Sequence, residues 1–318
     1  MRKLTQSMQS RIRDSVKKSL PSYLSGIKCW MAFCKVIEVP NFPATAERVA
    51  VYMSIFNDAG TARNYLAHLK KAHQMFVMPC DFDSPAARAV IKGIEKNSIK
   101  QKEPKTRVTM DILKPFVNEC IKRNLIQLGQ IAVLSYWFMF RVPSECFPLQ
   151  KSGKHSSFKI HANNTVSITL ACRKNNPSGE TLSRTCCCKS IGARFCPHAI
   201  LSKYNAYPAD RGLFNMKYAQ FLKQLRGILS YLNIQSSERF GSHAFRRGCA
   251  EDMRKRGAPL RDILEAGGWR SAAFLLYLER ENVERDAVAT IAIEYSNDED
   301  SDFEMIRVPK KKKIRVRK

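Results

Sequence analysis

The sequence of 318 residues contains no long apolar run. Its longest such stretch, Ile131 to Phe140, is too short to cross a bilayer as a helix. The amino-terminal region lacks an apolar core of signal-peptide length, and neither a basic amphipathic segment nor a lipidation signal is present. These absences argue against secretion and against a membrane partner, so we expect a soluble protein inside the cell.

Acidic residues are also scarce, with 28 aspartates and glutamates against 54 lysines and arginines. The resulting formal charge of +26 opposes a compact fold through self-repulsion unless a bound polyanion neutralises part of it. Nucleic acid is the commonest polyanionic partner. Cysteine, by contrast, is plentiful at 11 residues. A reducing compartment disfavours disulfides, so these cysteines should remain thiols or bind metal.

The length of the chain predicts two domains, and 44% hydrophobic residues suffice for packed cores. Apolar residues recur at helical spacing from Leu20 to about Glu95, which predicts a helical first domain over residues 1–103. A lysine-rich linker, residues 97–107, follows. Thr61 is predicted to cap a helix that runs to Met75. The basic residues along that helix, either a DNA-facing row or a solvated face, are Arg63, His68, Lys70, Lys71 and His73.

The second domain, residues 104–295, is predicted to combine helices with a small sheet. Strands are expected where polar and apolar residues alternate from Val166 to Leu170, and where Glu180 to Thr185 follow a turn-forming Asn-Asn-Pro-Ser-Gly segment. Helices are expected at residues 109–123, with Thr109 as the cap, at 128–140, at 216–232 and from His243 onward. The whole chain is therefore predicted to be mainly α with a small antiparallel β-sheet.

The stretch from Ser242 to Tyr277 carries the most distinctive chemistry. His243 and Arg246 lie three positions apart, which on a helix puts an imidazole beside a guanidinium, where they could hold an anion together. A solvated helix start would show the same pair. A double-glycine break then leads to Trp269, and Tyr277 follows in an apolar run. The combination favours a site over a plain helix start.

Two upstream residues complete the pattern. Arg141 directly follows the apolar helix and precedes Glu145, although an arginine there could also be an ordinary helix-ending cation. Lys174 lies between the two predicted strands, just before their turn. The following six residues, in this order and spacing, resemble the active site of the tyrosine recombinases of the phage-integrase family, including those of eukaryotic mobile elements: Arg141, Lys174, His243, Arg246, Trp269 and Tyr277.

The resemblance covers roughly residues 10–290. It implies a helical, SAM-like core-binding domain that binds DNA at 1–103 and a tyrosine-recombinase catalytic domain at 104–295. It also implies a site-specific recombinase or integrase that cleaves and rejoins double-stranded DNA. Such an enzyme would act as a homotetramer on paired sites and require no cofactor for catalysis.

The implied reaction gives a role to each residue. Tyr277 would attack the scissile phosphate and form a 3′-phosphotyrosyl bond while a 5′-hydroxyl leaves. Arg141 and Arg246 would grip the nonbridging oxygens through planar, forked hydrogen bonds. Lys174 would protonate the leaving oxygen, and His243 would help to move the tyrosine proton.

Several alternatives stay open at this point. Trp269 could donate its indole N–H to the phosphate or pack in the core. Glu145 stands four residues after Arg141, where the family more usually has three, and Pro143 lies between them. The orienting role of Glu145 is therefore open. The alternative functions are a catalytically inactive DNA-binding protein derived from a recombinase and a type IB topoisomerase-like enzyme, and the complete set of six residues favours the active recombinase.

A second cluster of reactive side chains follows the predicted strands. Cys186, Cys188, Cys196 and His198 form a C-x-C and C-x-H pattern that could close a tetrahedral structural zinc site. The spacing is not that of a standard zinc finger, and buried thiols are the competing interpretation. The resemblance to recombinases neither requires nor supports a metal here.

Residues 296–318 are predicted to be a disordered tail, first acidic and then basic. Its basic part, around Lys310 to Lys313, resembles a nuclear localisation signal, although a DNA-tethering tail fits nearly as well. We expect the protein in the nucleus if its host is a eukaryote, and otherwise in the cytoplasm or nucleoid.

Overall fold

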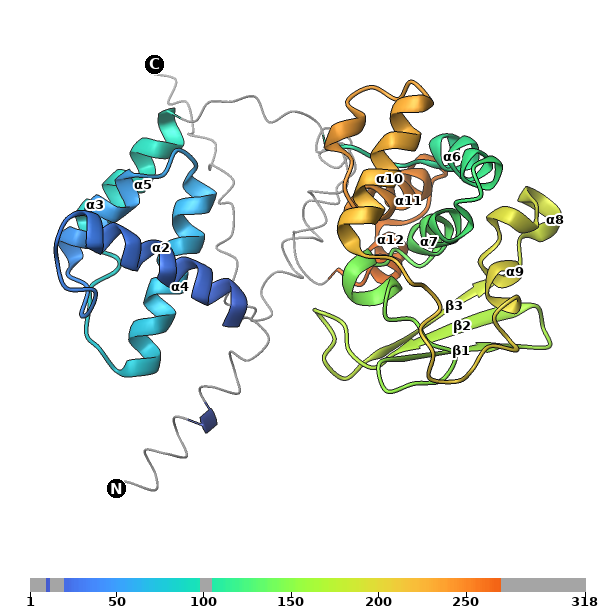
Figure 1. The fold of residues 1–318 in the computed structure, drawn as a ribbon, viewed down its shortest axis with the longest axis horizontal. Helices are drawn as coiled ribbons and strands as arrows, with labels where there is room; N and C mark the ends of the chain where they lie inside the picture. Colours follow the sequence, from blue (N-terminus) through green and yellow to red (C-terminus); the bar gives the residue numbers. More distant parts are fainter. Residues whose placement is uncertain (1–9, 12–19, 98–104, 270–318) are drawn as a thin grey trace, which may run out of the picture. The chain divides into compact units, whose positions relative to one another are not determined.

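The computed structural model describes residues 10, 11, 20–97 and 105–269 (Figure 1). The chain divides into two compact units, Met1–Glu103 and Pro104–Lys318, and the division falls within the predicted linker. Helices dominate both units, and the second also contains a three-stranded antiparallel sheet. The predicted fold class, mainly α with a small antiparallel β-sheet, is confirmed.

The N-terminal unit is a bundle of amphipathic helices that bury their apolar stripes against one another. Its described helices are α2 (Leu20–Val36), α3 (Ala46–Ser54), α4 (Ala59–Phe76) and α5 (Pro85–Asn97). Helix α2 packs against α4, and α3 packs against α5. Trp30 and Tyr52 meet edge to face within this core, with ring centroids 5.1 Å apart. The unit thus has an aromatic core of its own.

Helix α4 differs from the sequence prediction in two details. Its N-cap is Asp58, whose carboxylate accepts the Thr61 N–H at 2.7 Å, so the prediction of Thr61 as the cap was wrong. His73, predicted on the basic row, is instead buried in the core. There its Nε2 accepts the Ala44 N–H at 2.9 Å, and its Nδ1 lies 3.0 Å from the Leu69 carbonyl oxygen. This histidine therefore holds backbone groups and does not face a ligand.

The C-terminal unit is organised around one buried helix, α7. Its described helices are α6 (Met110–Lys122), α7 (Ile126–Trp137), α8 (Cys188–Ile191), α9 (Pro197–Ser202), α10 (Tyr218–Tyr231), α11 (His243–Lys255) and α12 (Leu260–Gly267), with a π-helical turn η1 (Val142–Cys146) and two 3-10 turns, η2 (Ala193–Phe195) and η3 (Ser237–Arg239). Helices α6, α9, α10 and α11 contact α7, whose side chains are apolar nearly all round. Across the described ranges, no helix is both long enough and apolar enough to span a membrane.

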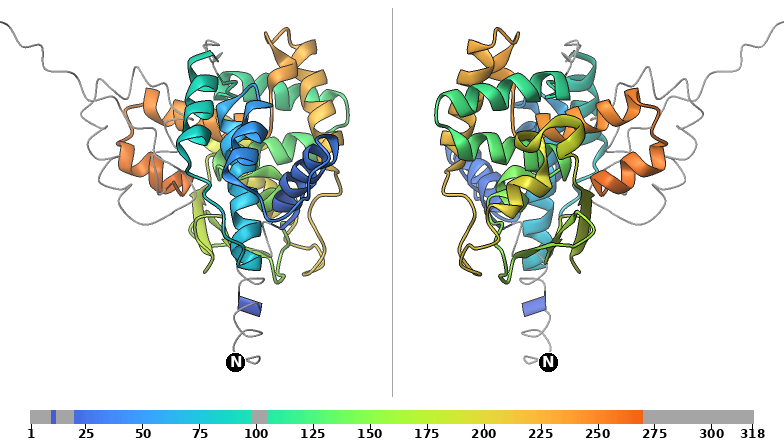
Figure 2. Two further views of the ribbon diagram at one scale, coloured as in Figure 1. Left: turned by 90° about the vertical axis from the view of Figure 1, so that its left-hand side faces the viewer. Right: turned by 90° about the vertical axis from the view of Figure 1, so that its right-hand side faces the viewer.

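The sheet consists of β1 (Ser156–Ile160), β2 (Thr165–Leu170) and β3 (Glu180–Thr185), paired antiparallel in that order. The register aligns Phe158 with Ile168 and Ile168 with Leu182, which forms a buried cross-strand row. Helix α9 lies against the strands (Figure 2). The predicted β-hairpin on either side of the Asn-Asn-Pro-Ser-Gly turn is confirmed.

Helix α7 ends at Trp137, whereas the apolar run predicted a helix that reached Phe140. Met139 adopts a left-handed φ of +49°, which stops the helical path. The Phe140 N–H then turns back to the Ser135 carbonyl at 3.1 Å. Residues 138–140 remain buried, so their apolar character reflects packing in the core and not helix.

Helix α11 is anchored against the segment that leads into α6. Thr109, the predicted cap, makes no side-chain cap bond, and Asp252 of α11 instead accepts the Met110 N–H at 2.6 Å. Gly248 permits this close approach, because a Cβ there would lie 1.8 Å from the Val108 carbonyl oxygen. Backbone contacts therefore fix the position of α11 in the unit.

Candidate active site

Arg141 follows the buried, non-helical residues 138–140 that come after α7, and it is the N-cap of η1. In this turn the Phe147 N–H donates to the Val142 carbonyl, five residues back, at 3.0 Å. A π-helical turn holds one residue more than an α-helical turn, which accommodates the longer spacing between Arg141 and Glu145. The Glu145 carboxylate accepts the Arg141 backbone N–H at 2.9 Å and a guanidinium N–H at 2.6 Å. Glu145 therefore orients Arg141 despite the extra residue.

Glu145 is only 2% exposed, yet its surroundings favour the carboxylate. Burial raises its pKa, but the charges of Arg173 and Arg141 and the hydrogen bond from the Arg141 backbone outweigh burial, so the pKa is lowered overall. Two nitrogens of the Arg173 guanidinium each lie 3.3 Å from a Glu145 oxygen. The carboxylate thus joins two arginines below the surface.

Arg173 is a site residue that was not predicted from the sequence. It is 3% exposed, and besides Glu145 it donates to the Glu180 carboxylate at 2.8 Å. These bonds fix the β2–β3 hairpin to η1. The sequence offered a weak signal, since Arg173 stands next to Lys174 and Glu180 follows across the same turn.

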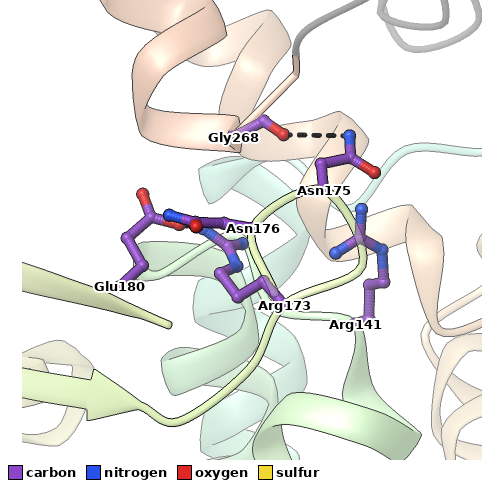
Figure 3. Close-up of a pocket in the computed structure, with 6 residues that line it drawn as sticks. All are labelled: Arg141, Arg173, Asn175, Asn176, Glu180 and Gly268. Atoms are coloured by element: carbon purple, nitrogen blue, oxygen red, sulfur yellow. Dashed lines mark hydrogen bonds and ion pairs between the residues drawn. The ribbon is translucent and has the colours of Figure 1, made fainter. Parts of the chain in front are cut away.

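A small pocket opens between this hairpin and the end of α12, with a cavity volume of about 50 Å³. It is lined by Arg141, Arg173, Asn175, Asn176, Glu180 and Gly268 (Figure 3). The Asn175 amide donates to the Gly268 carbonyl at 3.3 Å, as Figure 3 shows. Gly268 has a left-handed φ of +61°, and a Cβ there would lie 3.0 Å from Arg173 Nη1. Glycine therefore suits both the backbone and the close contact.

His243 is the first residue of α11 and lies among arginines. Burial lowers its pKa from the ordinary 6.5, and the charges of Arg247, Arg246 and Arg141 lower it further. The imidazole is therefore neutral near neutral pH, as a proton acceptor must be.

Arg246, one turn further along α11, is fully buried. Its Nη1 donates to the Met139 carbonyl at 3.0 Å, and its Nη2 donates to the Gly267 carbonyl. The Trp269 ring lies against the guanidinium, with the Arg246 Cζ 4.5 Å from the ring centroid, and Trp269 is itself buried. Arg246 thus links the segment that precedes Arg141 with the end of α12.

The predicted catalytic residues are placed unequally. Arg246 joins α11, which begins at His243, to the Met139 carbonyl, two residues before Arg141, whereas Lys174 is exposed on the hairpin. Of the predicted catalytic residues that the structure describes, only Arg141 lines the pocket. Tyr277 lies outside the described residues, as does the predicted tail of residues 296–318.

Three of the predicted metal ligands lie in the segment between β3 and α9, and the fourth, His198, lies in the first turn of α9. The sulfur atoms of Cys186, Cys188 and Cys196 are all within 4.8 Å of one another. His198, the predicted fourth ligand, does not belong to this group. The structure therefore brings together three of the four predicted ligands.

Solved structures with the same backbone arrangement define the class of fold. The chain is similar to the XerH site-specific recombinase bound to palindromic difH substrate in a post-cleavage complex, with a TM-score of 0.59 and 15% identity, covering 91% of this chain and 84% of XerH. A pre-cleavage complex of XerH with difH substrate gives a TM-score of 0.54 and 15% identity, over 89% of this chain and 83% of XerH. No protein-family model and no curated protein matches the sequence. The chain has the fold of the tyrosine recombinases, and the resemblance noted in the sequence is confirmed at the level of the fold.

Proposed function

We propose that this protein is a site-specific recombinase or integrase that cleaves and rejoins double-stranded DNA through a 3′-phosphotyrosyl intermediate. The observation that carries this proposal is the bond from Arg246 of α11 to the Met139 carbonyl, two residues before Arg141, within a tyrosine-recombinase fold. The formal charge of +26 suits a polyanionic substrate. The similar XerH structures each hold a recombination substrate.

In the proposed reaction the Tyr277 oxygen attacks phosphorus, and the bond from phosphorus to the 5′-oxygen breaks. His243, neutral at working pH, accepts the tyrosine proton, and Lys174 donates a proton to the departing 5′-oxygen. Arg141, held by Glu145, stabilises the charge that builds on the nonbridging oxygens. The phosphodiester energy is kept in the phosphotyrosyl bond, so a 5′-hydroxyl can attack it and rejoin the strand.

A second candidate function is DNA binding without strand exchange, by a protein derived from a recombinase. The burial of Arg246 favours this alternative, because two of its nitrogens already donate to the Met139 and Gly267 carbonyls. A guanidinium in this arrangement stabilises the fold whether or not a phosphate binds. The two candidates differ in one product, a covalent link between protein and DNA.

The test uses duplexes that the full-length protein selects from a random library, each prepared with a nick that lets the cleaved strand diffuse away. Wild-type protein should accumulate a covalent adduct, and Tyr277→Phe should form none while still binding the duplex, since phenylalanine has no nucleophilic oxygen. Tyr231→Phe is the matched control, because Tyr231 is 60% exposed at the end of α10. Its adduct should equal that of the wild type.

Three outcomes would contradict the proposal. Undiminished adduct with Tyr277→Phe would remove Tyr277 from the mechanism. Tight, selective binding by the wild type without any adduct would favour the DNA-binding alternative. Relaxation of supercoiled plasmid that lacks selected sites would instead indicate a topoisomerase-like enzyme.

The assembly and location of the protein belong to the same proposal. We propose a homotetramer on two paired sites, since strand exchange needs a cut in each of four strands. Native mass measurement of the protein with paired sites should then show four chains. For a host with a nucleus, the basic run Lys310 to Lys313 should direct nuclear import, as expected for a mobile-element recombinase, and replacing these lysines with glutamine should abolish it.

A further inference from the structure

Three cysteines meet at the base of the loop that joins β3 to α9. Cys186 directly follows β3, Cys188 opens α8, and Cys196 directly precedes α9. Their sulfurs lie within 4.8 Å of one another, and those of Cys186 and Cys196 are 3.8 Å apart. All three are free thiols, and Cys196 is fully buried. The loop therefore starts and ends at a single group of sulfur atoms.

The separation of these sulfurs fits a shared metal ion better than a disulfide. In a tetrahedral site with zinc–sulfur bonds of about 2.3 Å, two ligand sulfurs lie about 3.8 Å apart. A disulfide would hold them at about 2.0 Å. The Cys186 to Cys196 separation of 3.8 Å matches the edge of such a tetrahedron.

The backbone around the group supports bound thiolates. The Cys187 N–H donates to the Cys196 sulfur at 3.3 Å. A hydrogen bond of this kind stabilises negative charge on sulfur and holds a ligand in one orientation, as the outer partners of metal ligands do. The backbone between Cys186 and Cys188 thus already faces the sulfur that closes the loop.

Apolar packing holds the first half of this loop only weakly. Helix α8 has no fully buried residue, and its Ile191 packs only partly buried against the core. The second half is anchored, since the Trp137 indole donates to the Phe195 carbonyl at 2.9 Å and Phe195 is buried. A metal ion shared by Cys188 and Cys196 would link the weakly packed half to the anchored half.

We propose that Cys186, Cys188 and Cys196 bind one zinc ion, as a structural centre that fixes the end of β3 to the start of α9. Zinc suits soft thiolate ligands in a tetrahedral group. The fourth ligand comes from His198, two residues after Cys196, or from Cys187, which lies between Cys186 and Cys188. This centre is independent of the proposed recombinase activity, and its test measures metal and not cleavage.

The first experiment measures zinc in full-length protein purified with reductant and supplied with Zn²⁺. Wild-type protein and Cys80→Ser should hold about one ion per chain, whereas Cys196→Ser should hold none. Cys80 is a matched control because it is a partly buried free thiol in the N-terminal unit. Chelation should lower the Tm of the wild type and of Cys80→Ser by about 5 °C or more.

A second measurement does not depend on whether a variant folds. Wild-type protein loaded with Co²⁺ should show the visible bands of tetrahedral cobalt and a near-ultraviolet band from thiolate ligands. If His198 is the fourth ligand, His198→Ala changes the visible bands and keeps the thiolate band. If Cys187 is the fourth ligand, Cys187→Ser weakens the thiolate band.

The proposal would be overturned by wild-type protein that takes up no zinc under these conditions, or by Cys196→Ser that retains a full equivalent. Cobalt bands without a thiolate contribution would overturn it as well. Bound iron in place of zinc, visible as a coloured cluster, would contradict the choice of metal. Each of these results can be obtained whether or not the protein cleaves DNA.

Discussion

The two units differ in how deeply their ion pairs are buried. In the N-terminal unit ion pairs lie near the surface, and the side chains of Arg63 and Glu95 are 40% and 47% exposed. In the C-terminal unit Arg173 and Glu145 pair with side chains only 2% exposed. Burying charge costs desolvation energy, and such networks are frequent at functional sites. The buried pair of the C-terminal unit therefore lies where the proposed chemistry would take place, whereas the exposed pair of the N-terminal unit faces solvent.

The histidines of the two units show the same contrast. His73 is buried between backbone groups of the N-terminal unit and serves its core. His243 lies among arginine charges that lower its pKa beyond the effect of burial. Residue type alone therefore does not separate a structural histidine such as His73 from one among charged groups, such as His243, for which we propose a role in proton transfer.

The largest expected effect comes from neutralising the buried carboxylate. Glu145→Gln leaves Arg173 without its full counter-charge, so we expect a loss of about 3–5 kcal/mol in the free energy of unfolding. Glu95→Gln in the N-terminal unit should cost at most about 1 kcal/mol, because its ion pair is exposed. Denaturant unfolding of both full-length variants measures the two values. Similar losses would mean that burial does not distinguish the two units.

The next effect concerns a guanidinium that bridges two backbone carbonyls. Arg246→Lys keeps the charge but cannot span the Met139 and Gly267 carbonyls, so single-turnover cleavage should slow by a factor on the order of 100. Arg48 in the N-terminal unit also donates to two backbone carbonyls. Arg48→Lys should change cleavage by no more than about twofold. A wild-type rate for Arg246→Lys would point to Arg247 or to a purely structural role.

The smallest effect separates two histidines by their response to salt. Burial alone lowers the pKa of His68, whereas burial and three arginines lower that of His243. Salt screens charge but leaves burial unchanged, so added salt should raise the His243 pKa and leave that of His68 constant in an NMR titration. An equal response of both rings would show that the arginine charges do not act on His243.

The same depressed values fix the sign of the pH dependence. Each ring has a lower pKa in the folded protein than the 6.5 of an unperturbed histidine. The unfolded chain therefore binds protons first, so stability is retained above about pH 6.5 and declines as the pH falls below it. Cleavage of pre-bound DNA should likewise fail only below pH 6.5, and added salt should move this acid limb upward.

Local patterns were enough to predict much of the fold. Alternation over Val166 to Leu170 and the following turn gave the hairpin, and the break at Gly257 separates α11 from α12, where its φ is +76°. Arg141, His243 and Arg246 could be proposed because their order along the chain matched a known family pattern. The link from Arg246 to the segment that precedes Arg141 follows from the fold that this order implied.

Tertiary partners decided what the sequence could not reveal. Arg173 takes its place from Glu145 and Glu180, which approach it from η1 and β3. His73 does not join the exposed basic residues of α4, because its ring accepts the Ala44 N–H in the core. His198 stands two residues from Cys196, yet sequence spacing did not bring it to the three sulfurs.

The π-helical turn η1 has a consequence for how the gene can change. A turn that already holds a surplus residue can lose it as a deletion at Pro143 or Ser144, both exposed, and return to an ordinary helical turn. Selection would then act on the position of the Glu145 carboxylate beside the Arg141 guanidinium, and not on the number of codons between the two residues. Related chains should therefore differ in length at η1 and still keep the ion pair between the arginine and the glutamate. A sequence alignment that requires a fixed number of residues between the two would miss relatives that a superposition of structures would identify.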